Sequence, residues 1–296
     1  MVNKEYAPFM KNWYALQLGD YIHKYRIQAI CDGVRELGGE VVVCRSAVEV
    51  LEALELYPVT VGFTSGMREN EAESREVLQE REIPLLVADC GYFQRANDNA
   101  LAGYNQLGIG RLCWTPPTPM PSDRYDKLGM PEVALPKLGS ARNCLILGQV
   151  AGDAQHGLKE AELAEWLRNA ARAFDKPAWR LRYRPHPRGS WARLGIEDEV
   201  SRPQVYSLDN DLDKADYVIT YNSTGGLEAI ARGLPVICHE DAHYAHIADY
   251  GLGCKRYEDV MQYFYNLAYS QWTIPEISSG LGLQFINRYA SFIRPH

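Results

Sequence analysis

The sequence predicts an α/β protein of two domains, each built around a parallel sheet. Short β-rich runs alternate with helical patterns along both halves of the chain, which is the order that parallel sheets require. A proline-rich stretch separates the two halves. The length of 296 residues, with 46% hydrophobic and 23% charged residues, suits a globular protein with two modest domains.

The first half is expected to hold four strands and three helices in alternation. Its first helix ends at Gly38-Gly39, because glycine commonly follows a helix C-terminus. The expected strands cover residues 13–17, 40–44, 58–63 and 83–88, and the expected helices cover 27–37, 47–56 and 68–81.

Regular structure is then interrupted by prolines. The run Thr115-Pro-Pro-Thr-Pro-Met-Pro121 cannot continue a helix or a central strand, because proline lacks the backbone N–H. We therefore expect an N-terminal domain at 1–114, a linker at 115–140, a second domain at 141–272 and a C-terminal helix at 273–296 that packs back on the first domain.

The second domain is expected to restart the alternation with Asn143-Cys-Leu-Ile-Leu-Gly148 as a strand. Apolar residues then recur at helical spacing between residues 159 and 174. The further expected strands cover 179–184, 205–208, 217–220 and 235–238, and the expected helices cover 159–174, 211–215, 227–232, 258–270 and 276–293.

Composition argues against several classes of protein. The net charge of -7 and the pI of about 5.6 give no general attraction to nucleic acid or anionic membranes. No apolar run approaches the roughly 20 residues that span a bilayer. The first residues lack the apolar core of a signal peptide. Seven scattered cysteines without a CxxC pair are typical of a reducing compartment, so we expect a cytoplasmic protein.

The clearest functional signal is a polar, glycine-rich turn between an expected strand and an expected helix. The segment Tyr217-Val-Ile-Thr-Tyr-Asn-Ser-Thr-Gly-Gly-Leu-Glu228 places two hydroxyls and two glycines at the helix start. Helix N-termini attract anions through their N–H groups and dipole. We expect phosphate contacts from Asn222, Ser223, Thr224, Gly225 and Gly226, and a ribose contact from Glu228. The alternative is a tight structural turn with a solvated Glu228.

Two further loops follow expected strands of the second domain, where open α/β sheets bind ligands. In Arg184-Pro-His-Pro-Arg188, two prolines fix the direction of His186, and the flanking arginines suit a phosphate. An ordinary loop histidine is the alternative. Gln149-Val-Ala-Gly-Asp153 follows the first strand of this domain, so Gln149 and Asp153 are candidates by position.

An acidic segment, Asp89-Cys-Gly-Tyr-Phe-Gln-Arg95, follows the last strand of the first half. Asp89 is either a turn former or the carboxylate best placed for a general base. Contacts with the second substrate are expected from Tyr92, Arg95, Asp20 and His23.

The N-terminal stretch interleaves basic and aromatic residues, a pattern that can grip a nucleic-acid strand. Core aromatics beside a solvated charged face are the alternative. The residues are Lys4, Lys11, His23, Lys24, Arg26, Tyr6, Phe9, Trp13, Tyr14, Tyr21 and Tyr25.

His239-Glu-Asp-Ala-His243 matches the H-E-x-x-H zinc motif, which needs both histidines on one helix face. Because the segment directly follows an expected strand, we expect a loop and no metal site.

These segments together resemble the GT-B glycosyltransferases, in particular the capsule-polysaccharide and Kdo-transferase-type branch and its phage-encoded relatives. The similar segments are Glu228-Ala-Ile-Ala-Arg-Gly-Leu-Pro-Val-Ile237, Arg184-Pro-His-Pro187, Gln149 to Asp153, Asp89 to Arg95 and Gln271-Trp-Thr-Ile-Pro-Glu-Ile-Ser-Ser-Gly280. Cys90 interrupts the acidic motif of that branch. The resemblance implies two Rossmann-like domains with parallel sheets that face a central cleft.

The resemblance also implies an activity: metal-independent, inverting sugar transfer from a nucleotide sugar. Asp89 would be the base, and His186 and Arg184 would stabilise the departing phosphate. A UDP-sugar is favoured over a CMP-sugar, with no other cofactor. The expected acceptor is 5-hydroxymethylcytosine in phage DNA, inside the bacterial host cytoplasm. Alternatives are a capsule or lipopolysaccharide sugar as acceptor, a nucleotide-sugar epimerase, and a non-catalytic nucleotide-sugar-binding protein.

Overall fold

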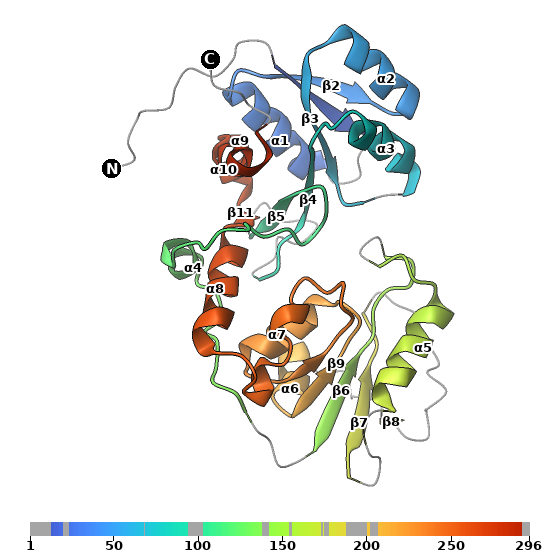
Figure 1. The fold of residues 1–296 in the computed structure, drawn as a ribbon, viewed down its shortest axis with the longest axis vertical. Coiled ribbons are helices and arrows are strands. Elements are labelled where there is room, and N and C mark those ends of the chain that lie inside the picture. Colours follow the sequence, from blue (N-terminus) through green and yellow to red (C-terminus); the bar gives the residue numbers. More distant parts are fainter. Residues whose placement is uncertain are drawn as a thin grey trace. The chain divides into compact units, whose positions relative to one another are not determined.

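The computed structural model divides the chain into two compact units. The first unit joins Met1–Met130 with Tyr265–His296, and the second is Pro131–Phe264. The structure describes residues 13–19, 24–67, 69–93, 103–137, 142–153, 156–172, 174, 178–187, 200–201 and 207–291 (Figure 1).

The first unit contains a six-stranded sheet in the order β11-β5-β4-β3-β1-β2. Strands β2, β1, β3 and β4 are parallel, while β5 is antiparallel to both β4 and β11. The strands are β1 (Tyr14–Leu18), β2 (Glu40–Cys44), β3 (Val59–Ser65), β4 (Leu85–Cys90), β5 (Asn105–Ile109) and β11 (Gln271–Trp272).

Helices cover both faces of this sheet because successive strand residues point to opposite sides. Ala15 packs in a core with α1, α9 and α10, whereas its neighbour Leu16 packs in a core with α2 and α3 (Figure 1). The helical elements are α1 (Lys24–Glu36), α2 (Ala47–Leu56), η1 (Glu69–Glu71), α3 (Ala72–Glu80), α4 (Asp123–Leu128), α9 (Ile274–Ser278) and α10 (Leu281–Ala290).

The C-terminal segment therefore returns to the first unit, as predicted. Helix α8 (Tyr257–Ala268) leads out of the second unit, and α9 then packs closely on α1. A Cβ atom on Gly33 of α1 would lie 2.3 Å from the backbone oxygen of Ile277, so only glycine permits this approach.

The second unit contains a five-stranded parallel sheet in the order β10-β9-β6-β7-β8. Chain order runs from β6 outward to β8, then returns to β9 on the other side of β6. This is the doubly wound arrangement, with its switch point between β6 and β9. The strands are β6 (Asn143–Leu147), β7 (Arg180–Arg184), β8 (Val200–Ser201), β9 (Tyr217–Ile219) and β10 (Val236–Ile237).

Helix α5 covers one face of this sheet and α6 and α7 cover the other (Figure 1). Leu163 and Leu167 of α5 share a buried core with Ile146. The helical elements are α5 (Glu160–Ala171), α6 (Leu208–Leu212), α7 (Thr224–Ala231), η2 (Ala245–Ile247) and η3 (Tyr250–Leu252). None of the helices in the described ranges has the length and apolar character needed to cross a membrane.

The structure differs from the sequence-based prediction at several places. Helix α4 forms directly after the proline run and ends at Gly129, which has a positive φ of 57°. The single helix expected at 276–293 is two helices, because Gly280 adopts a φ of +79° between them. Strands β5, β8 and β11 were not predicted. Leu208, expected to end a strand, instead begins α6, and residues 205–206 lie outside the described chain.

A partly buried ion pair joins α4 to α9 in the first unit. Arg124 Nη2 donates to Glu276 Oε2 at 2.9 Å, and the backbone N–H of Thr273 donates to the same oxygen at 3.0 Å. Burial alone would raise the pKa of Glu276, but the hydrogen bonds from Arg124 and Thr273 outweigh it and lower that pKa to about 2. The carboxylate is therefore stabilised by folding.

This ion pair predicts a pH dependence of stability. Since the folded pKa lies below the unfolded value of 4.5, the stabilisation is present above pH 4.5 and is lost as the pH falls toward 2. Glu276→Gln is expected to lower the free energy of unfolding at pH 7 by about 2–3 kcal/mol and to flatten the acid dependence. Urea denaturation at several pH values measures both effects, with exposed Glu73→Gln as control. Equal acid slopes in Glu276→Gln and the parent protein would contradict the assignment.

Candidate functional site

The carboxyl ends of β6, β7 and β9 form one edge of the second sheet. Strand register places Leu147 beside Arg184, and Ile146 lies between Tyr183 and Ile219. The loops that follow these three strands therefore start side by side, at the switch point where doubly wound sheets bind ligands. All three loops were predicted to contact the donor.

The side chain of Gln149 joins two of these loops. Its Nε2 donates to Asn222 Oδ1 at 2.6 Å, and its Oε1 accepts from the backbone N–H of Asn222 at 3.0 Å. The hydroxyl of Thr220 lies 3.4 Å from the same Oε1. Because both ends of the Gln149 amide are used, the loop after β6 fixes the turn that precedes α7.

Helix α7 begins directly after this turn with a capped N-terminus. Ser223 Oγ accepts from the backbone N–H of Gly225 at 3.2 Å, and the hydroxyl of Tyr244 donates to the Ser223 carbonyl at 2.5 Å. Ser223 and Thr224 are both half-buried. The positive end of the helix dipole is therefore held at the same sheet edge as Gln149.

Close packing explains the two glycines of this turn. A Cβ atom on Gly225 would lie 2.7 Å from Leu147 Cδ1, and a Cβ atom on Gly226 would lie 2.3 Å from the Tyr244 hydroxyl. Both glycines are buried. The structure thus gives them a packing role, in addition to the close approach of a ligand that the sequence suggested.

Two arginines of β7 share one buried carboxylate. Arg182 Nη2 lies 3.0 Å from Asp211 Oδ1, and Arg184 Nη1 lies 2.5 Å from Asp211 Oδ2. Asp211 is fully buried on α6, whereas the two arginine side chains are about one-fifth exposed. Two positive charges facing one negative charge leave this group of three side chains with a net positive charge. This combination suits a phosphate.

Asp211 was not predicted as a site residue. Its role depends on the alternation of β7, whose Leu181 and Tyr183 enter the core under α5 and so turn Arg182 and Arg184 toward α6. In the sequence, the segment after Ser207, the N-cap of α6, shows only an acidic helical turn. Nothing in that pattern indicates that Asp211 pairs with β7.

The remaining predicted donor residues lie on or beside the same edge. Asp153 closes a turn, with its carbonyl accepting from the backbone N–H of Gly157 at 2.7 Å. His186 is half-buried two residues after β7 ends. Glu228 is half-buried on α7, and its carbonyl accepts from Arg232 Nη1 at 3.2 Å.

An aromatic group, missed by the sequence prediction, adjoins this edge on the α5 face. Tyr221 stacks on His239 with ring centroids 4.4 Å apart, and the rings of Trp166 and His156 pack edge-on against Tyr221. Burial lowers the pKa of His156, although Asp153 acts in the opposite direction. His156 Nδ1 accepts from the backbone N–H of Leu158 at 3.0 Å, so the neutral ring carries its proton on Nε2.

The H-E-x-x-H segment does not form a helix. His239 follows β10 in a loop, and His243 is placed by Tyr263, whose hydroxyl contacts its Nδ1. Within the part of the chain that the structure describes, no three His, Cys, Asp or Glu side chains gather in a way that could hold a metal ion.

Asp89 lies at the carboxyl end of β4 in the first unit, with its side chain 30% exposed. Its Oδ1 accepts from the backbone N–H of Cys90 at 2.7 Å and lies 3.9 Å from Arg26 Nη1. Arg26, one of the basic residues considered for nucleic-acid contact, is fully buried, and Trp13 is a core residue at 1% exposure.

The loop after Asp89 is anchored by the C-terminal segment. Gln271 is fully buried, and its Oε1 accepts from the backbone N–H groups of Tyr92 at 2.8 Å and Phe93 at 3.0 Å. Tyr92 is 1% exposed, and its hydroxyl donates to Gln106. The structure therefore places the Tyr92 side chain in the core, although the sequence suggested an acceptor contact.

A second carboxylate, which the sequence prediction missed, lies at this edge of the first sheet. Glu71 is 3% exposed and accepts from the Thr64 hydroxyl at 2.6 Å. Gly19, with φ of +76°, leaves room for it, since a Cβ atom there would lie 2.6 Å from Glu71 Oε1.

Several predicted residues lie outside the described chain. They are Asp20, His23, Arg95, Arg188 and the N-terminal Lys4, Tyr6, Phe9, Lys11 and Tyr21.

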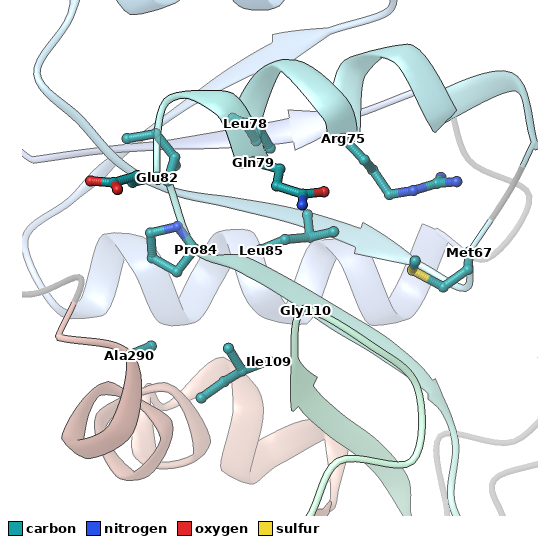
Figure 2. A pocket seen from close by; sticks show the side chains of 11 residues that line it. Met67, Arg75, Leu78, Gln79, Glu82, Pro84, Leu85, Ile109, Gly110 and Ala290 are labelled. Carbon is teal, nitrogen blue, oxygen red and sulfur yellow. The ribbon is translucent and has the colours of Figure 1, made fainter. Parts of the chain in front are cut away.

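A groove of about 580 Å³ is present elsewhere in the first unit (Figure 2). Met67, Arg75 and Leu78 line it on one side, and Ile109 and Ala290 line it on the other. None of the predicted site residues that the structure describes lines this groove.

The pairing of Arg182 and Arg184 with Asp211 predicts that the stability of the fold depends strongly on Asp211. Asp211→Asn removes the negative charge between Arg182 and Arg184, and breaking a buried ion pair from one side typically costs about 3–5 kcal/mol. Urea denaturation is expected to show a loss of this size. Asp209→Asn on the same helix is the control, because Asp209 is 68% exposed and pairs only at the surface with Arg232. Equal losses for the two variants would contradict the proposed charge pairing.

Comparison with known proteins relates this architecture to solved structures. No protein-family model matches the sequence, and no curated protein matches it. One similar structure is the beta Kdo 2,7 transferase KpsC of Thermosulfurimonas dismutans, with a TM-score of 0.57, 15% identity, and 92% of this chain and 99% of that chain covered.

The beta Kdo 2,4 transferase KpsC of the same organism is also similar. Its TM-score is 0.53 and its identity 12%, with 86% of this chain and 90% of that chain covered. Both likenesses extend across the two units. The GT-B fold with two Rossmann-like domains, predicted from the sequence motifs, is confirmed: the chain has the fold of these two transferases.

Proposed function

We propose that this protein transfers a sugar from a nucleotide sugar to an acceptor hydroxyl. One observation carries the proposal: the second unit gathers the Gln149–Asn222 bridge, Arg184 and the α7 N-terminus at the switch-point edge of its sheet. This edge suits a phosphate group. The chain also shares the fold of two Kdo transferases.

The donor is held through its phosphates and ribose in this proposal. Arg184, His186 and the hydroxyls of Ser223 and Thr224 contact the phosphates, and Glu228 accepts hydrogen bonds from the ribose hydroxyls. Gln149 holds the turn of Asn222, and Asp153 closes the neighbouring loop. A UDP-sugar and a CMP-sugar remain alternative donors.

The chemistry is a direct displacement. Asp89 takes the proton of the acceptor hydroxyl as that oxygen bonds to the anomeric carbon. The bond from this carbon to the donor phosphate oxygen breaks, and the nucleotide leaves with the bonding electrons. Arg184, His186 and the α7 N-terminus stabilise the negative charge that develops on the phosphate. Displacement in one step inverts the anomeric centre.

For the acceptor, a carbohydrate hydroxyl is favoured by the names of the two similar transferases. The alternative is 5-hydroxymethylcytosine in DNA. That alternative depended on the resemblance to phage-encoded members and on the basic and aromatic N-terminal stretch, of which Arg26 and Trp13 are buried. The other acceptor candidates Arg95, Asp20 and His23 lie outside the described residues.

A donor and acceptor panel tests the proposal. The purified protein is incubated with UDP- and CMP-activated sugars, including an activated Kdo, and with either glycan acceptors or hydroxymethylated duplex DNA. Mass spectrometry is expected to show released nucleotide and a glycosylated acceptor, and NMR an inverted linkage. Conversion of the donor sugar without an acceptor would indicate an epimerase, and binding without turnover would indicate a binding protein. Retention would refute one-step displacement.

The role of Asp89 is tested separately. Asp89→Asn is expected to lower kcat by about 10²- to 10⁴-fold, because it removes the proton acceptor. The affinity for nucleotide, measured by calorimetry, is expected to remain unchanged. Asp32→Asn is the matched control, since Asp32 is an exposed carboxylate on α1 that pairs with Arg35. Full activity in Asp89→Asn would refute the assignment of the base.

A further inference from the structure

Arg26 is a buried cation with an unusual set of partners. It is 0% exposed on α1, where its Nε donates to Asn105 Oδ1 at 2.7 Å and its Nη2 donates to Cys90 Sγ at 3.0 Å. Nη1 is buried without a hydrogen-bond partner in the described part of the chain. A buried guanidinium is costly unless it is paired with opposite charge.

Asp89 supplies that opposite charge. Among the described residues it is the one carboxylate within 4.0 Å of Arg26, and its Oδ1 lies 3.9 Å from the unpartnered Nη1. The separation is too long for a hydrogen bond but short enough for strong attraction in a partly buried setting. Asp89 is 30% exposed, whereas the Arg26 side chain is 1% exposed. The cation therefore lies behind the carboxylate, away from solvent.

Neighbouring side chains fix Arg26 in place. Asn105 is fully buried on β5, directly opposite Cys90 in the sheet, so two strands hold the guanidinium from one side. The Tyr25 ring lies 5.1 Å from its central carbon. A cation held at three points cannot turn away from Asp89 without breaking these contacts.

We propose that Arg26 is a positioning residue that keeps the Asp89 carboxylate ionised and directs its Oδ1 toward the protein interior. An ionised carboxylate is what proton removal requires, so the inference rests on the proposed function of Asp89. Two contacts, from Arg26 Nη1 and the Cys90 N–H, act on the same oxygen and thereby fix the carboxylate plane.

Other titratable groups pack around this end of the sheet. Cys90 follows Asp89 on β4, and the Tyr92 hydroxyl is bonded to Gln106. On the neighbouring strand β3, the Thr64 hydroxyl donates a hydrogen bond to the buried carboxylate of Glu71. Tyr25 comes from α1 beside Arg26. Arg26 is the cation among these described groups. Removing its positive charge is therefore expected to raise the pKa of Asp89.

The test is an NMR titration of the Asp89 carboxyl carbon in full-length protein labelled with ¹³C-aspartate. The spectrum of Asp89→Asn assigns the signal. Arg26→Gln and Arg26→Met are expected to move its titration midpoint upward by about 1 pH unit or more. Arg35→Gln on the same helix is the control, because Arg35 is exposed and pairs with Asp32. An unchanged midpoint in a folded Arg26 variant would overturn the proposal.

Two further measurements test the role of Arg26. If neither Arg26 variant folds, a parent-protein midpoint at or above the ordinary aspartate value of about 3.9 overturns the proposal by itself. With active protein, Arg26→Gln is expected to move the acid limb of the pH–rate profile upward and to add no loss in the Asp89→Asn background. A shifted midpoint without any sugar transfer would refute the proposed function alone, whereas transfer with an unshifted midpoint would refute the role of Arg26 alone.

Discussion

The hydrogen bonds between Gln149 and Asn222 are the interaction on which the second unit's functional edge depends. These residues are 73 positions apart, yet one amide side chain joins the loop after β6 to the loop after β9. The bond crosses the switch point of the sheet, where the strand order reverses and the two loops lead to opposite sides. By fixing the turn before α7, it sets where the helix dipole and the Ser223 hydroxyl are directed.

The two units differ in which member of an ion pair is buried, and this difference matches the function proposed for each unit. In the second unit, Asp211 pairs with both Arg182 and Arg184, which orients two cations that remain partly exposed and suited to a phosphate. In the first unit, Arg26 is fully buried, and Asp89, its nearest carboxylate among the described residues, is partly exposed. The second unit therefore has two partly exposed arginines paired with a buried aspartate. The first unit has a partly exposed aspartate beside a buried arginine.

Local patterns in the sequence predicted most of the fold, whereas long-range partners could not be predicted. The bounds expected for β2 and α2 agree with the structure because hydrophobic periodicity and the Ser46 cap define them locally. The loops of Gln149 and Asn222 were each identified, but their bond depends on strand register. Tyr92 belongs to the core because Gln271, 179 residues away, holds its backbone. Strands as short as β11 carry no periodic signal.

We propose that the switch-point edge of the second unit binds the nucleotide of the donor. Amide hydrogen exchange, measured by mass spectrometry with and without UDP, CMP and their activated sugars, tests this claim most directly. Slower exchange is expected in residues 147–153, 184–187 and 220–228 with at least one nucleotide, because bound phosphate and ribose order these loops. Unchanged exchange in all three segments, with protection confined to other parts of the chain, would contradict it.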